Sequence, residues 1–378
     1  MITISEITTK KQWKLFAKFP IELYKNCPNY VPAFLSDDYN MANPEKNPAA
    51  ANATVKGWLA YKDGVLVGRI AAILLPESNA QWNQKRLRFS RLDAIDDKNV
   101  FAALLETVEN FAKANGLTEV HGPWGFNDTD REGMLTDGYD LMGSYITYYN
   151  FPYYNDRMKE LGYQAESVWV ESEILFPKEG EPLYERFFKL GEYTKKRYKL
   201  KELCETLSVK QIVKRYGDKF FDCYNAAYKD LDMFVEIKDE AKQAILNQFS
   251  MMINKDFLSV LVNENDDVVA FCVVLPSFGK IVKKHGGKTS LPFILDFLKY
   301  IKKPDVLELT LIAVRPEFKK KGYTAGCIAR MMQSFSRNNV KTVLSCPTLE
   351  TNEAVRAQWS ALDNKIVKRR QTYIKPID

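Results

Sequence analysis

The segment LELTLIAVRPEFKKKGYTAGCIARMM, residues 307–332, carries the strongest structural signal in this chain. Residues 307–314 are apolar and partly β-branched, which predicts a buried strand, and Arg315-Pro316 ends that strand. After Thr324 the apolar residues recur at helical spacing, at Ile328, Met331, Met332 and Phe335. The segment therefore predicts a strand, a basic glycine turn and an amphipathic helix, in that order.

The turn between this strand and this helix has the chemistry of an anion site. Lys319, Lys320, Lys321 and Gly322 come directly before the predicted helix. A helix start presents free N–H groups and the positive end of the helix dipole, and a glycine lets a phosphate approach the backbone closely. The sequence therefore predicts that this turn binds a diphosphate.

This segment resembles the coenzyme-A-binding signature of the GNAT superfamily of acyl-CoA N-acyltransferases. In that signature Arg or Gln, two variable residues, Gly, one further residue and Gly or Ala surround the pyrophosphate. Lys319, Gly322 and Thr324 occupy these places, so the first Gly is the strict match. The elements predicted next, a strand at 340–346, a helix at 352–359 and a strand through 371–375, are similar to the end of a GNAT domain.

The resemblance implies that acetyl-CoA or another acyl-CoA is the co-substrate, and that the backbone of the predicted strand pairs with its pantetheine arm. The expected cofactor-binding residues are Ile312, Ala313, Val314, Lys319, Lys320, Lys321, Gly322, Tyr323, Thr324, Ala325 and Asn352.

The same order of elements is predicted twice along the chain. Residues 57–75 predict a hairpin across Lys62-Asp63-Gly64, and a strand at 87–92, a helix near 100–111 and a strand at 119–121 follow. In the second half, 257–263 and 268–275 predict another hairpin, again followed by strand, helix and strand. We therefore expect an α/β (α+β) fold of two tandem GNAT-like domains, residues 1–178 and 179–378. Each is expected to be a mixed, mostly antiparallel sheet flanked by helices.

The two predicted domains differ at the turn where the diphosphate would bind. In the first half this turn contains Asp96 and Asp97, whose carboxylates would cap the following helix and repel an anion. We therefore expect coenzyme A to bind in the second domain alone, with the first serving as a scaffold or substrate platform.

Residues 121–140 are polar and Gly-rich, and an aromatic cluster follows them. Together with Asn150-Phe-Pro-Tyr-Tyr154 and Leu161-Gly162-Tyr163, this stretch resembles an uncharacterised group of bacterial GNAT-like proteins. One interpretation is an acceptor pocket; the other is a long, turn-rich connection whose aromatic residues fill the space between domains. The expected substrate-binding residues are Trp124, Asn127, Asp128, Arg131 and Glu132.

Acyl transfer to an amine needs a base for the amine and an acid for the leaving thiolate. Several GNAT enzymes have a glutamate base at the place of Glu308, and apolar neighbours would raise its pKa. The alternative is a carboxylate that faces solvent or pairs with Lys302. The tyrosine that many GNAT enzymes use as the acid is replaced by Trp359, which leaves Tyr323 or Tyr373 as substitutes.

Composition sets wider limits. The chain of 378 residues has 46% hydrophobic content, six scattered cysteines and no apolar run near the roughly 20 residues of a membrane span, which predicts a cytoplasmic protein without a membrane partner. The net charge of +6 suits an anionic ligand and does not by itself imply nucleic acid. With two histidines in the chain we expect no histidine-rich metal site. A homodimer is left open.

The combined expectation is an N-acyltransferase, in particular an N-acetyltransferase, that modifies an amine of a small or amino-acid-like acceptor. Three alternatives are a non-catalytic protein that senses acyl-CoA, a Fem-like aminoacyltransferase, and an enzyme similar to the protein N-myristoyltransferases.

Overall fold

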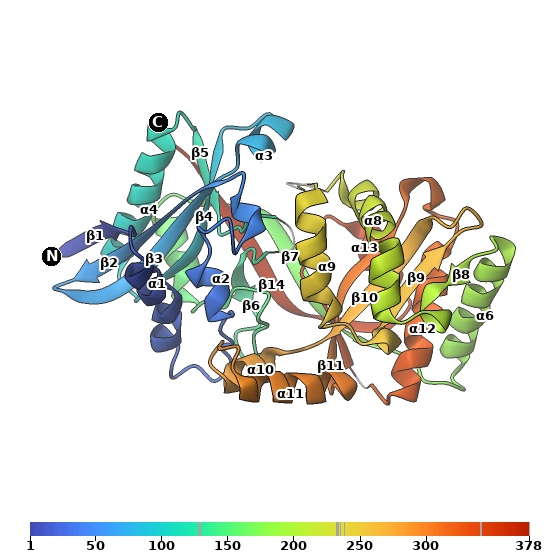
Figure 1. Cartoon of the computed structure of the whole chain (residues 1–378). Helices are drawn as coiled ribbons and strands as arrows, with labels where there is room; N and C mark the ends of the chain where they lie inside the picture. The colour runs from blue at the N-terminus through green and yellow to red at the C-terminus, as the bar shows by residue number, and fades with distance from the viewer. Residues whose placement is uncertain (128–129, 232–233, 235, 238, 341, 378) are drawn as a thin grey trace.

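The computed structural model describes residues 1–378 except 128–129, 232–233, 235, 238, 341 and 378 (Figure 1). The strands are β1 (Ile2–Glu6), β2 (Thr54–Lys62), β3 (Val65–Leu74), β4 (Arg86–Ala94), β5 (Glu119–Gly122), β6 (Met134–Asp137), β7 (Gln164–Leu175), β8 (Lys201–Glu202), β9 (Leu258–Val262), β10 (Val268–Pro276), β11 (Val306–Val314), β12 (Thr342–Ser345), β13 (Thr348–Leu349) and β14 (Asp363–Pro376). The helices are α1 (Lys10–Leu23), α2 (Leu35–Tyr39), α3 (Pro76–Gln81), α4 (Lys98–Ala114), α5 (Tyr153–Glu160), α6 (Pro182–Arg197), α7 (Leu203–Thr206), α8 (Val209–Tyr228), α9 (Asp239–Ser250), α10 (Gly279–Lys284), α11 (Leu291–Lys302), α12 (Tyr323–Arg337) and α13 (Glu353–Trp359). Short 3-10 helices are η1 (Pro48–Ala50), η2 (Lys255–Phe257) and η3 (Pro316–Phe318).

Both halves of the chain follow one plan, as the sequence predicted. Antiparallel strands β1 to β4 lead through α4 to β5, which pairs in parallel with β4; in the second half β8 to β11 lead through α12 to β12, which pairs in parallel with β11. The predicted hairpin turn is present at Asp63 and Gly64, both in the left-handed region (φ 52° and 82°) that such tight turns require.

The two halves share one continuous sheet because they exchange strands. Strand β14 comes from the end of the chain, yet it pairs with β5 of the first half and with β7. Strand β7 in turn pairs with β12 of the second half. Figure 1 shows β14 and β7 running side by side between the two lobes. The expected division at residues 178 and 179 stays a prediction.

Separate cores lie on the faces of this sheet. In the first half α4 buries Val100, Leu104 and Val108 against the strands, which is the face predicted from their spacing. In the second half α12 buries Cys327, Ile328 and Met331 in the same way. Each helix thereby fixes the turn at its start relative to the strand before it.

The starts of these two helices differ as expected. Asp97 caps α4, since its side chain accepts a hydrogen bond from the Asn99 amide at 2.9 Å and pairs with Lys62 at 2.7 Å. Helix α12 is capped by Gly322, which has no side chain for this purpose. A carboxylate therefore caps the start of α4, whereas no side-chain cap is present at the start of α12 among the described residues.

Candidate functional site

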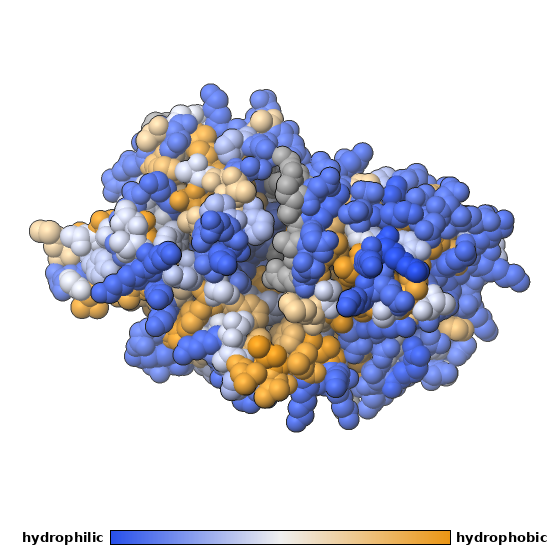
Figure 2. Space-filling model, in the orientation of Figure 1, coloured by the Kyte–Doolittle hydropathy of each residue, from blue (hydrophilic) through white to orange (hydrophobic). Residues whose placement is uncertain are grey.

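A cavity of about 1090 Å³ lies between the two halves and takes its walls from both. The molecular surface is hollowed where the two lobes meet (Figure 2). Seven residues predicted from the sequence line the cavity: Trp124, Asn127, Arg131, Glu132, Glu308, Ile312 and Asn352. Asp128 lies outside the described residues. The loop of residues 121–140 and strand β11 thus contribute to one site, although they are far apart in the sequence.

Strand β11 separates from β12 beside this cavity. The parallel pairing covers residues 306–309 of β11, and the last contact is the Cys346 amide donating to the Leu309 carbonyl at 3.1 Å. Beyond that point β11 continues to Val314 with β10 as its strand partner within the described residues. One backbone edge of residues 310–314 is therefore open to an extended ligand, since such edges accept an added strand.

A β-bulge marks the place where β11 leaves β12. The register to β10 shifts between Val273 and Val274, whose partners are Leu311 and Leu309, so Thr310 is the extra residue. A bulge takes its residue out of the regular hydrogen-bond ladder. Thr310 lines the cavity, and its hydroxyl donates to the Glu308 carbonyl at 3.1 Å. Further along the strand, the Tyr228 hydroxyl donates to the Ile312 carbonyl at 3.2 Å.

Glu308 lies on β11 just before this bulge and is 5% exposed. One carboxylate oxygen accepts from the Ser277 hydroxyl at 2.7 Å, and the other accepts from the Ser144 hydroxyl at 3.4 Å. Burial raises the pKa of Glu308, and these hydrogen bonds offset only part of the rise. Glu308 is therefore a desolvated carboxylate at the wall of the cavity. It does not pair with Lys302 within the described residues, contrary to the alternative considered from the sequence.

A second buried charged group from β14 stands behind Glu308. Lys368 donates to the Met142 carbonyl at 2.8 Å, and its ammonium lies 3.7 Å from a Glu171 oxygen. Burial lowers the pKa of Lys368. Glu171 also pairs with Arg370, which donates to Thr147 at 2.9 Å. In the sequence, Lys368 and Arg370 are two residues apart, which places both on one face of a strand. Nothing in the sequence showed that this face of β14 is buried.

The predicted diphosphate turn follows directly from the end of β11. Lys320 and Gly322 both have positive φ angles (63° and 78°), and the chain turns through η3 into α12. The side chains of Lys319, Lys320 and Lys321 are exposed. Ala325 is buried in the first turn of α12. An unfilled helix start beside three lysines is a suitable place for an anion.

Tyr323 occupies a different environment from Glu308. Its ring stacks on Phe318 at 5.0 Å between centroids and packs against Tyr198 at 4.9 Å. Burial raises the pKa of Tyr323, and the residue is not among those that line the cavity. Tyr373 is fully buried in the first-half core, where its hydroxyl donates to Asn155 at 2.7 Å. The structure therefore does not bring either tyrosine together with Glu308.

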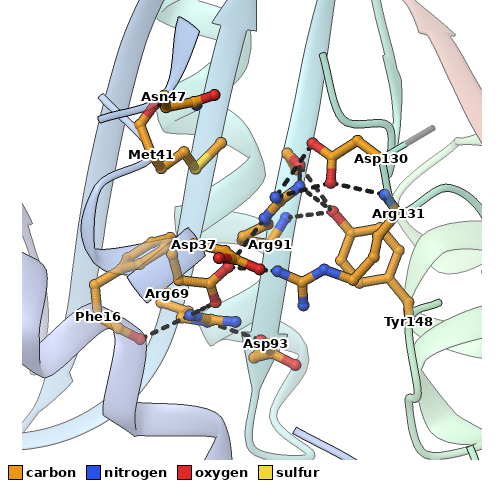
Figure 3. Close-up of polar contacts among 12 residues, drawn as sticks. Phe16, Asp37, Met41, Asn47, Arg69, Arg91, Asp93, Asp130, Arg131 and Tyr148 are labelled. Atoms are coloured by element: carbon orange, nitrogen blue, oxygen red, sulfur yellow. Dashed lines mark hydrogen bonds and ion pairs between the residues drawn. The ribbon is translucent and has the colours of Figure 1, made fainter. Parts of the chain in front are cut away.

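The first-half wall of the cavity is held by a buried cluster of charges (Figure 3). The Asp38 carboxylate pairs with Arg69 at 2.7 Å, with Arg91 at 3.2 Å and with Arg131. Burial opposes ionisation of Asp38, but the three arginines outweigh it and hold its pKa well below the ordinary value. Asp93 pairs with Arg69 at 2.8 Å, so the cluster joins α2 to β3 and β4 and to the loop that carries Arg131.

A neighbouring carboxylate, Asp37, faces the cavity. Asp37 is exposed at the cavity, yet desolvation by the surrounding protein raises the pKa of Asp37 to about 6, and Arg131 partly opposes the shift. Asp37 and Glu308 both raise the pKa of Tyr145, after the larger effect of burial, and Tyr145 also lines the cavity. Asp37, Glu308 and Tyr145 thus line the same cavity. Asp37 and Tyr145 were not predicted from the sequence, which gave no sign that α2 reaches this site.

Trp124 adds a polar group to the same cavity. Its ring packs edge to face on Trp169 at 5.3 Å, and the side chain is 2% exposed. The indole Nε1 is buried without an acceptor among the described residues. Such a donor is costly unless something accepts its hydrogen bond. The tryptophan is therefore suited to donate to an oxygen of a bound ligand.

A metal site and a membrane-spanning helix each require a particular arrangement, and neither arrangement is present among the described residues. They contain no group of three or more His, Cys, Asp or Glu side chains arranged to hold a metal ion. They also contain no helix with the length and apolar character needed to cross a bilayer.

Comparison with solved structures defines the class of fold. The chain aligns over its whole length with a tandem GNAT protein from the clavulanic acid biosynthesis pathway, covering 98% of that chain with a TM-score of 0.53 at 11% identity. The protein therefore has a tandem GNAT fold, as the sequence predicted. No family model matches the chain.

Two curated proteins are similar in sequence. The chain is 32% identical to Protein YghO of Escherichia coli (strain K12) over 154 residues. This matched segment makes up 41% of the chain and 39% of that protein. The chain is also 27% identical to the bacterial ceramide synthase of Caulobacter vibrioides (strain NA1000 / CB15N) over 164 residues. This segment makes up 43% of the chain and 42% of that protein. The match thus spans about two fifths of each relative.

Proposed function

We propose that this protein is an acyl-CoA-dependent N-acyltransferase. The observation that carries the proposal is the course of β11, which leads from a buried carboxylate, past a bulge and an open backbone edge, to an unfilled helix start beside three lysines. A thioester carrier with an extended arm and a diphosphate matches these features in the same order. Residues 310–314 would take the arm, and the turn at Gly322 would take the phosphates.

The chain's own residues would divide the chemistry as follows. Glu308 accepts a proton from the acceptor ammonium, because its raised pKa makes it a better base than an exposed carboxylate. The Thr310 amide donates to the oxygen on which negative charge develops. Tyr145 lines the cavity, and we propose it in place of Tyr323 or Tyr373 as the donor to the leaving sulfur.

We further propose that the acceptor is an amine with a long apolar chain. The cavity volume of about 1090 Å³ exceeds what a small amine needs, and its lining includes Phe34, Leu75, Phe126, Ile237, Ile245 and Met252. Asp37 offers a carboxylate to the ammonium. The similarity to a protein named ceramide synthase supports an acceptor of this kind. This differs from the small acceptor expected from the sequence.

In this proposal the two halves have different tasks. The second half holds the acyl carrier, and the first half supplies the acceptor wall through Trp124, Asn127, Arg131 and Glu132. Asp97, which caps α4, would repel a phosphate there, so we propose one carrier site per chain.

The test is thiol release from acetyl-CoA and palmitoyl-CoA, with sphinganine or a short alkylamine as acceptor. Glu308→Gln should lower kcat by about 10²–10⁴-fold while the Kd for the carrier stays within about twofold. Glu264→Gln is the matched control, because Glu264 is an exposed glutamate in the β9–β10 turn. Equal rates for Glu308→Gln and the wild type would remove Glu308 from the mechanism.

A binding measurement separates the proposal from a sensing role. Tight binding of acyl-CoA with no turnover of any amine would favour the non-catalytic alternative. Turnover with aminoacyl-tRNA and none with acyl-CoA would favour the Fem-like one. If no acyl-CoA binds, the proposed function is wrong.

A further inference from the structure

Helix α11 exposes a stripe of large apolar side chains. Leu291, Ile294, Leu295 and Leu298 are 70%, 44%, 62% and 52% exposed. Their spacing of three and four residues places them on one face of the helix. They form a hydrophobic patch at the lower edge of the molecule (Figure 2). We call these four residues the α11 stripe.

The opposite face of α11 is also apolar, and it is the face that anchors the helix. Phe293 is buried, and Phe297, Tyr300 and Ile301 pack on the same small core with Phe278 and Val282. A helix that is apolar on both faces is typical of a position between two apolar environments. Within the described residues the protein supplies one apolar environment, the small core around Phe278. The α11 stripe on the other face is exposed.

Lysines surround the α11 stripe. Residues 279–305 contain seven lysines and two aspartates. Both aspartates already have partners, since Asp296 pairs with Lys284 at 2.6 Å and Asp305 pairs with Lys280. The side chains of Lys288, Lys299, Lys302 and Lys303 are exposed. An apolar stripe within a positively charged border is the pattern of a helix that lies in the interface of an anionic membrane.

One layer of side chains separates α11 from the proposed catalytic cavity. Phe34 lines the cavity and packs against Phe293 with ring centroids 5.5 Å apart. Tyr145, another lining residue, packs against Phe278 at 6.1 Å, and Phe278 stacks on Phe297 at 4.5 Å. A surface bound to α11 would therefore lie directly beneath the cavity.

We propose that the α11 stripe and its lysine border bind the surface of an anionic lipid bilayer. The charge of the border favours a bilayer over a second copy of this chain, because two such borders would repel each other. A surface-bound helix needs no spanning segment, so the proposal replaces the expectation that no membrane takes part. Its use in delivering a long-chain amine rests on the proposed function, whereas the binding itself does not.

The test is co-sedimentation of the full chain with vesicles, without substrates. Wild-type protein should bind vesicles of phosphatidylcholine and phosphatidylserine in equal parts, and binding should weaken with added salt and with phosphatidylcholine alone. The double variant Leu291→Asp/Leu295→Asp should bind at least about tenfold more weakly. The matched control is Leu190→Asp/Val65→Asp, which adds the same charge at two exposed apolar residues elsewhere and should bind as the wild type does.

Thermal unfolding shows whether each variant keeps its fold, and turnover of a short, water-soluble amine with acetyl-CoA tests the proposed function separately. Equal vesicle binding by the wild type and the α11 double variant would overturn the proposal, as would failure of the wild type to bind anionic vesicles. A wild-type dimer that the α11 variant converts to a monomer would also overturn it, since another copy would then cover the stripe.

Discussion

Removing the charge of Asp38 should lower the free energy of unfolding by several kcal/mol. Asp38 is 3% exposed and pairs with three arginines, Arg69, Arg91 and Arg131. The variant Asp38→Asn keeps the shape of the side chain and removes its charge. Arg69 then keeps its ion pair with Asp93, and Arg91 keeps its ion pair with Asp130. The ion pair between Arg131 and Asp38 is lost.

Breaking a buried ion pair on one side costs about 3–5 kcal/mol, because the other charge stays buried without compensation. With a urea slope of about 3 kcal/mol per molar or more for a chain of this size, the midpoint should fall by roughly 1 M. The assay is urea unfolding followed by circular dichroism at pH 7. Asp63→Asn serves as control and should leave the midpoint unchanged, since Asp63 is exposed.

The pH dependence gives a second check on the same reasoning. The pKa of Asp38 is lowered in the folded state, so its contribution is present above its ordinary pKa of 3.8 and is lost as pH falls through the lower folded value. The difference between wild type and Asp38→Asn should therefore shrink in acid. A variant that unfolds at the wild-type urea concentration at pH 7 would refute the argument that Asp38 compensates the three arginines.

Three further outcomes follow from other parts of the structure. Burial raises the pKa of Glu308, so its ionisation destabilises the fold as pH rises above the ordinary value of 4.5, and Glu308→Gln should have a higher Tm than wild type at pH 8 but not at pH 4. Replacing Lys319, Lys320 and Lys321 by glutamate should weaken coenzyme A binding in calorimetry, most strongly at low salt. The matched triple charge reversal at Lys210 and Lys214 of α8 and at Lys229, directly after α8, should not. Asp97→Ala should lose the cap of α4 and about 1 kcal/mol of unfolding free energy in urea titration, and an unchanged midpoint would show that the cap contributes nothing.

Local patterns predicted most of the elements correctly. The hairpin at Asp63 and Gly64, the cap at Asp97 and the glycine turn at Gly322 depend on residues that are close in the sequence, and each is present. Glu308 was also placed on its strand from local pattern alone. These features needed no knowledge of which strands pair.

The missing parts of the site depend on long-range pairing. Arg69 and Arg91 lie within apolar strands, and that contrast was the signal of a buried charge, but Asp38 comes from a short helix whose position no local pattern fixes. Asp37 reaches the cavity for the same reason. Lys368 stands behind Glu308 because β14 crosses between the halves, and sequence periodicity does not specify such a crossing.

The exchange of β7 and β14 constrains how the chain acquires its structure. Strand β5 finds its neighbour β14 more than two hundred positions later in the sequence, through the pairs Tyr373 with Gly122 and Pro376 with Glu119. During synthesis the N-terminal sheet therefore keeps an unsatisfied edge until residues 363–376 have left the ribosome. If the ribosome stalls before that point, the N-terminal sheet keeps an unpaired, aggregation-prone edge at β5. We therefore expect the chain to need chaperones mainly while β14 is still being synthesised. The stability of either hydrophobic core should matter less for this need.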